Sequence, residues 1–130
     1  LTRRLEAAVV VQFDEPSLPA ALAGRLTGVT RFSPVHPVDE SVVTQLVDEC
    51  VAVVGGEVAV HSCAAGLPWK LLQRSTISAV SVDVQALTAA DLDGVGEFVE
   101  SGRTVLLGAV PTVVSGPEPS ARQIATTVAA

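Results

Sequence analysis

Val58-Ala59-Val60-His61-Ser62-Cys63 combines an uninterrupted apolar run with two side chains that commonly bind metals. The apolar run predicts a buried β-strand. Successive side chains alternate between the faces of a strand, so His61 and Cys63 are expected to share one face. An imidazole and a thiol placed this way are candidate zinc ligands. The alternative is structural, because a buried cysteine commonly packs as a small hydrophobe and a strand histidine commonly has a structural role.

Three further apolar runs, rich in Val and Ala, resemble the first. The predicted strands are residues 7–13, 58–60, 78–82 and 104–109. Each run is nearly continuous in apolar character, which is typical of strands that are buried on both faces. We therefore expect a sheet that is covered by other elements on both sides.

Helical patterns separate the predicted strands. The predicted helices are residues 39–54, residues 67–74, residues 88–101 and a segment from Ser120 onward. Gly55-Gly56 ends the first, and Thr88 with Asp91 forms a capping-box pattern at the start of the third. Trp69, in the second, is interpreted as a packing residue. Strands that alternate with helices predict an α/β fold with a parallel sheet.

The length of 130 residues limits the chain to one domain at most. Residues 1–130 are interpreted as a single partial domain of about four βα units. Two architectures fit: a small doubly wound sheet, or about half of a (β/α)8 TIM-like barrel. No glycine-rich phosphate loop follows a strand, which disfavours the first. The chain begins with Leu1, and we expect it to be an excised piece of a longer polypeptide.

The composition excludes several classes of protein. The hydrophobic content is 48% and the formal net charge is −6, without the Lys/Arg cluster that a nucleic-acid surface needs. No apolar run is long enough to span a membrane, and no signal peptide is evident. The only two cysteines do not form a disulfide framework. We therefore expect a cytoplasmic protein that binds neither nucleic acid nor membrane.

Polar side chains gather where the predicted strands end. They are Gln12 and Asp14 on the first strand, His61 and Cys63 on the second, and Ser81 and Asp83 on the third. Functional residues of parallel α/β proteins lie at the carboxyl ends of strands, so these side chains are a candidate site. The alternative is that Asp14 and Asp83 are solvated turn or helix-cap residues.

Three motifs, in order along the chain, resemble one known family. Residues 11–18, with Gln12-Phe13-Asp14-Glu15-Pro16 at their centre, resemble the Q-I-D-E-P-A-L motif of cobalamin-independent methionine synthases. His61-x-Cys63 resembles the H-x-C zinc motif of that family. Residues 79–83 lie where the family has a strand that ends in a zinc-binding Glu. The resemblance implies roughly strands four to seven of the family's catalytic (β/α)8 barrel.

The resemblance also implies a function and a set of site residues. In the family, zinc binds the sulfur of homocysteine, and the thiolate attacks the methyl group of methyltetrahydrofolate. By resemblance, His61, Cys63 and Asp83 would be the metal ligands, with Asp83 replacing the family's Glu. Asp14 would hold the amino group of the substrate, with Gln12 beside it in the substrate-binding set. The implied partners are a small-molecule thiol and a folate-type methyl donor.

The chain departs from the family at two places. The strand-eight motif that resembles N-P-D-C-G and carries a fourth zinc ligand is not in this sequence. Residues 108–112 contain no histidine where the family has a proton donor at the exit of strand seven. The resemblance therefore implies a shorter, methionine-synthase-like methyltransferase with an incomplete zinc site in this chain and no assigned catalytic residue.

Two alternatives stay open beside the methyltransferase. One is a degenerate homologue that binds a small molecule without turnover, and the other is an unrelated doubly wound α/β module. We expect the isolated 130 residues to be inactive. A half barrel also exposes sheet edges, so we expect self-association through them.

Overall fold

The computed structural model describes residues 7–30, 32–110 and 118–129, in which four strands form one parallel sheet. The strands are β1 (Val10–Asp14), β2 (Glu57–Ser62), β3 (Ala79–Asp83) and β4 (Thr104–Gly108). They lie in the order β1-β2-β3-β4, and each neighbouring pair is parallel. This sequential order is that of a barrel wall, whereas a doubly wound sheet reverses its order at a switch point. The predicted α/β partial barrel is confirmed, and the doubly wound alternative is wrong.

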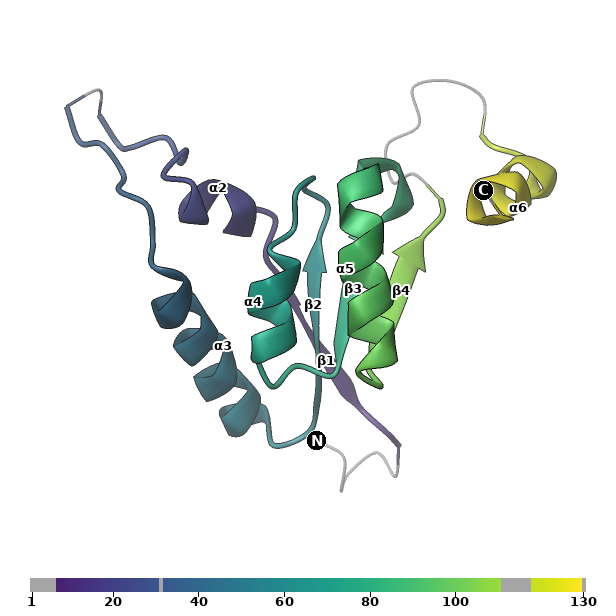
Figure 1. The fold of residues 1–130 in the computed structure, drawn as a ribbon, viewed down its shortest axis with the longest axis horizontal. Helices are drawn as coiled ribbons and strands as arrows, with labels where there is room; N and C mark the ends of the chain where they lie inside the picture. The colour runs from purple at the N-terminus through teal and green to yellow at the C-terminus, as the bar shows by residue number, and fades with distance from the viewer. Residues whose placement is uncertain (1–6, 31, 111–117, 130) are drawn as a thin grey trace.

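Helices connect the strands in the predicted alternation. They are α2 (Leu18–Leu22), α3 (Glu40–Val54), α4 (Trp69–Arg74), α5 (Ala89–Glu100) and α6 (Ala121–Ala129), with a short 3₁₀ helix η1 (Val84–Ala86) after β3. Figure 1 shows α3, α4 and α5 side by side on the same face of the sheet. No helix among the described residues is long and apolar enough to cross a bilayer.

Local chemistry sets the ends of the two longer helices. The Asp39 carboxylate accepts a hydrogen bond from the Ser41 backbone N–H at 2.8 Å and caps α3. Gly55 ends the same helix with φ of 61°, a left-handed conformation that glycine adopts without strain. Thr88 and Asp91 form the predicted capping box at the start of α5. The predicted helix boundaries agree with the observed ones to within two residues.

The core lies between the sheet and the helices. Val58, Val60, Val80 and Val82 are buried on the helix side of β2 and β3 and belong to one apolar cluster with residues of α4 and α5. Trp69 also belongs to this cluster, in edge-to-face contact with Phe98 at a centroid distance of 6.2 Å, as predicted for a packing residue.

The expectation that every strand is buried on both faces is wrong for the outer strands. On the face opposite the helices, Leu106 of β4 is 46% exposed and Val10 of β1 is 57% exposed. Leu107, the register partner of Val82, lies on the helix side at the edge of the sheet and is 48% exposed. The described helices that pack on the sheet lie on one face, so the opposite face of the outer strands has no such cover (Figure 1). This helix-free face carries the predicted site residues.

Candidate functional site

The strand register places three of the polar residues in one row across the sheet. Asp14 of β1 is the register partner of His61 of β2, which is in turn the partner of Ser81 of β3. The neighbouring residues Val60 and Val82 point into the core, so the row lies on the opposite, helix-free face. Leu106 continues the row on β4. The structure thus brings together, on one surface, side chains from three strands that are separated by long stretches of sequence.

Cys63 and Asp83 lie one step further toward the carboxyl ends of their strands. Asp83 is the last residue of β3, and Cys63 directly follows β2. Ser62 and Val82 are register partners, so Cys63 and Asp83 are the next residues along the two neighbouring strands. Cys63 is exposed with a free thiol, and Asp83 is half-buried. Both follow the alternation that puts them on the face of His61 and Ser81.

Asp83 also has a structural role. Its Oδ1 accepts a hydrogen bond from the Gln85 backbone N–H at 2.9 Å and caps η1. This agrees with the cap alternative for Asp83. A carboxylate has two oxygens and several lone pairs, so the cap occupies only part of its capacity to accept hydrogen bonds or bind a ligand.

Gln12 and Asp14 form a hydrogen-bonded pair. The amide Nε2 of Gln12 donates to Asp14 Oδ1 at 2.7 Å, in an exposed position. The backbone N–H of Glu15 donates to the His61 carbonyl at 2.7 Å, which extends the pairing of β1 and β2 beyond Asp14. The strand pairing therefore holds the backbone of Asp14, and the Gln12 amide orients its carboxylate. In this position the carboxylate can accept a hydrogen bond from an ammonium group.

His61 contacts Ser81 across the neighbouring strand. Its Nδ1 lies 3.1 Å from Ser81 Oγ, and both residues are half-buried. Sequence reasoning places Ser81 on this face but assigns it no role. Ser81 could have been found from the parallel pairing of the two strands. Once the register is known, this pairing shows which residue of β3 lies beside His61.

The described residues supply zinc-type donors but do not assemble a metal site. They contain no group of three or more His, Cys, Asp or Glu side chains that could hold a metal ion. An imidazole and a thiol are suitable zinc donors, whereas a zinc site needs three or four ligands. The donor types therefore agree with zinc, but the arrangement of the described side chains falls short of the number of ligands that zinc requires.

An apolar cavity of about 400 Å³ lies on the other side of the sheet. Its lining includes Phe13 and Val60 from the strands, Leu18 from α2, and Val47 and Cys50 from α3. Phe13, Leu18, Val47 and Val60 also belong to the core cluster or pack against it. The cavity is therefore a gap in helix packing and not part of the predicted site.

Comparison with known proteins agrees with the motif resemblance. The family model described as "Cobalamin-independent synthase, Catalytic domain" matches residues 1–130. No curated protein and no solved structure matches the chain.

Proposed function

This chain belongs to the family of cobalamin-independent synthases, within the catalytic domain, and from that premise we propose that it forms part of a methyltransferase site. The reaction moves a methyl group from a folate-type donor such as methyltetrahydrofolate to a thiol such as homocysteine. The observation that carries the proposal is the row of Asp14, His61 and Ser81 on the helix-free face at the carboxyl ends of the strands. That is where parallel α/β barrels hold their substrates.

Asp14 is the proposed binding group for the amino group of the thiol substrate. It is exposed, it lies next to His61 in the register, and Gln12 holds one of its oxygens. A carboxylate that accepts from an ammonium group makes a charge-assisted hydrogen bond. Gln12 therefore acts on the substrate by orienting this carboxylate.

His61, Cys63 and Asp83 are the proposed zinc ligands. Their shared face and their places at the ends of β2 and β3 support this set, as do the donor types. The described residues bring no three such side chains together, so we expect the 130 residues alone to bind zinc weakly and to be inactive.

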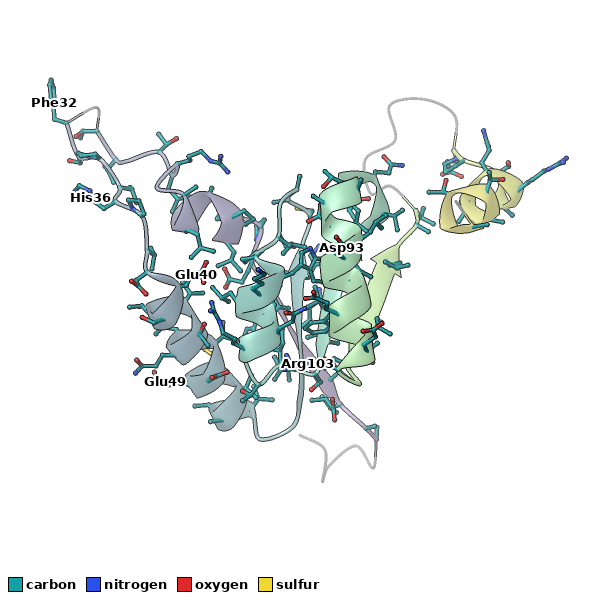
Figure 2. All side chains as sticks on the ribbon, in the orientation of Figure 1. Phe32, His36, Glu40, Glu49, Asp93 and Arg103 are labelled. Carbon is teal, nitrogen blue, oxygen red and sulfur yellow. The ribbon has the colours of Figure 1, made fainter. Side chains whose placement is uncertain are left out.

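The proposed zinc ligands are tested by measuring both the zinc content and the methyl-transfer activity of variants. In the full protein that the gene encodes, we expect His61→Ala to lose bound zinc and methyl transfer from methyltetrahydrofolate to homocysteine. His36→Ala is the matched control, because Figure 2 shows His36 on the loop before α3, away from the sheet. Equal zinc content in both variants would contradict the ligand assignment.

The absence of a three-ligand group in the described residues favours one second candidate. In it, the chain is a degenerate homologue that binds a small molecule on the same face without turnover. Binding of homocysteine by the wild-type full protein, with no methyl transfer under any metal condition, would establish this candidate in place of the first.

Three broader expectations belong to the same proposal. We propose that residues 1–130 are a single partial domain, that the protein acts in the cytoplasm, and that copies self-associate through the edges of the sheet. The last rests on β1 and β4, which are the outer strands of the described sheet. An edge strand presents unpaired backbone groups that can pair with another chain.

A further inference from the structure

The contact between His61 and Ser81 is built into the sheet. The two residues are register partners on adjacent parallel strands, and the Nδ1–Oγ distance is 3.1 Å. Both side chains are half-buried, and their strand neighbours Val60, Ser62, Val80 and Val82 are fully buried. Both residues therefore lie on paired strands of the sheet and not on loops, so the sheet itself places the imidazole ring next to the hydroxyl.

This contact fixes which nitrogen of His61 is free. A neutral imidazole carries one N–H and one lone pair, and a hydroxyl partner can accept from the first or donate to the second. Because Nδ1 faces Ser81, Nε2 is the nitrogen left for a ligand or a proton. Nε2 can accept only if the ring proton is on Nδ1.

We propose that Ser81 is a positioning residue, whose Oγ accepts a hydrogen bond from Nδ1–H of His61 and so keeps the lone pair on Nε2. The inference rests on the proposed function in one respect, because that function needs the Nε2 lone pair. It adds a residue that family membership alone does not assign. A partner on the second imidazole nitrogen commonly orients a functional histidine in this way.

Asp14 is the competing group. It is the register partner of His61 on β1, and a carboxylate beside an imidazole favours a proton on the nitrogen that faces it. Its Oδ1 accepts from Gln12 at 2.7 Å, which occupies part of the capacity of this carboxylate to accept hydrogen bonds. The hydroxyl of Ser81 can rotate to donate or to accept a hydrogen bond. The ratio of the two tautomers of His61 therefore depends on both Ser81 and Asp14, and this ratio can be measured.

Two substitutions of nearly the same shape test the proposal. Ser81→Thr keeps a hydroxyl, and Ser81→Val replaces it with a methyl group; both are β-branched and suited to a strand. Nitrogen-15 spectra of the imidazole, taken on the metal-free protein at about pH 8, report the tautomer of a neutral ring. We expect the Nδ1–H form in wild type and in Ser81→Thr. In Ser81→Val the tautomer ratio should shift about fivefold toward Nε2–H, the effect of one ordinary hydrogen bond.

Two results would overturn the proposal. One is an Nε2–H tautomer of His61 in the wild type, a result that does not depend on whether any variant folds. The other is the same tautomer ratio in Ser81→Thr and Ser81→Val. The signal of His36 should be constant throughout and serves as an internal control.

Zinc titration of the same proteins separates this inference from the proposed function. If the wild-type full protein shows the Nδ1–H tautomer but takes up no zinc, the metal part of the proposed function is wrong and the role of Ser81 is supported. If zinc binds while the tautomer is Nε2–H in the metal-free protein, the positioning role of Ser81 is wrong.

Discussion

At the scale of single residues, Asp91 joins two helices through a buried carboxylate. Asp91 is 5% exposed. Its Oδ1 accepts a hydrogen bond from Trp69 Nε1 at 3.0 Å. Its Oδ2 accepts from the Thr88 backbone N–H at 2.9 Å and from Thr88 Oγ1 at 2.6 Å. Burial by itself raises the pKa of Asp91, but the hydrogen bonds from Thr88 and Trp69 outweigh it, so the pKa lies below its usual value. The ionised form is therefore part of the stable fold.

The lowered pKa of Asp91 predicts an acid-dependent part of the stability. A carboxyl group whose pKa is lower in the folded state stabilises that state above the unfolded pKa of about 4, and this stabilisation is lost as the pH falls through the folded pKa. We expect Asp91→Asn to be less stable than wild type near neutral pH and to lose less stability on acidification. Urea unfolding at several pH values measures both.

Asp93→Asn is the matched control for that experiment. Asp93 is exposed on the same helix and takes no part in the hydrogen bonds that Asp91 makes (Figure 2). This variant should keep the wild-type dependence of unfolding free energy on pH. If Asp91→Asn also kept it, the buried carboxylate would not be the source of the acid sensitivity.

At the scale of elements, α4 and α5 pack through Trp69 and Gly94. A Cβ atom added at Gly94 would lie 2.3 Å from Trp69 Cγ, so any larger residue forces the indole to move. Gly96, on the same helix, has nothing within 4 Å of such an atom. The two glycines therefore differ in packing while sharing the same helix.

This difference predicts opposite effects for two identical substitutions. Gly94→Ala should destabilise the fold by about 1–3 kcal/mol through overpacking. Gly96→Ala should stabilise it by about 0.5–1 kcal/mol, because alanine is the better helix former. Chemical denaturation of both variants measures the difference. Equal effects would show that Trp69 does not pack as described.

Arg103 connects the start of β4 to the end of α4. Its Nη1 donates to the Leu72 and Ser75 carbonyls at 2.9 and 3.0 Å, and its guanidinium lies 5.1 Å from the centroid of Phe98 (Figure 2 labels Arg103). A planar guanidinium presents five N–H donors in a fixed fork and can lie over an aromatic ring at the same time, whereas an ammonium has three donors at the end of a flexible stem.

Arg103→Lys should therefore cost about 1–2 kcal/mol although it keeps the charge. Thermal or urea unfolding measures this cost. Arg122→Lys, which changes an exposed arginine of α6, should be close to neutral. An Arg103→Lys variant as stable as wild type would mean that the carbonyl contacts contribute little.

The elements also show what sequence alone can and cannot predict. The ranges of α3 and α5 follow from apolar periodicity and from caps such as Thr88, and the positions of the four strands follow from continuous apolar runs, all of which are local signals. The bounds of the first strand are predicted less well, because β1 begins at Val10 and not at residue 7. The exposure of Leu106 could not be predicted, because an apolar run does not show which faces later elements will cover. The His61–Ser81 contact likewise depends on the register between strands, which is a property of the sheet.

At the scale of the whole molecule, an open sheet with one helix-free face predicts association between copies. Sedimentation of the 130-residue chain should show dimers or larger species whose proportion rises with concentration. Leu106→Lys, which places a charge on the outer strand β4, should reduce this association. Val53→Lys, at an 88% exposed position on α3, should not. A wild-type chain that is monomeric at every concentration would contradict the prediction.

The central claim is that the helix-free face at the carboxyl ends of the strands binds the thiol substrate. Its most direct test is the KM for homocysteine in methyl transfer by the full protein, compared between Asp14→Asn and Asp93→Asn. We predict that Asp14→Asn raises the KM about 10- to 100-fold, the effect of losing a hydrogen bond to a charged group. Asp93→Asn should match wild type. Equal KM values in the two variants would contradict the claim.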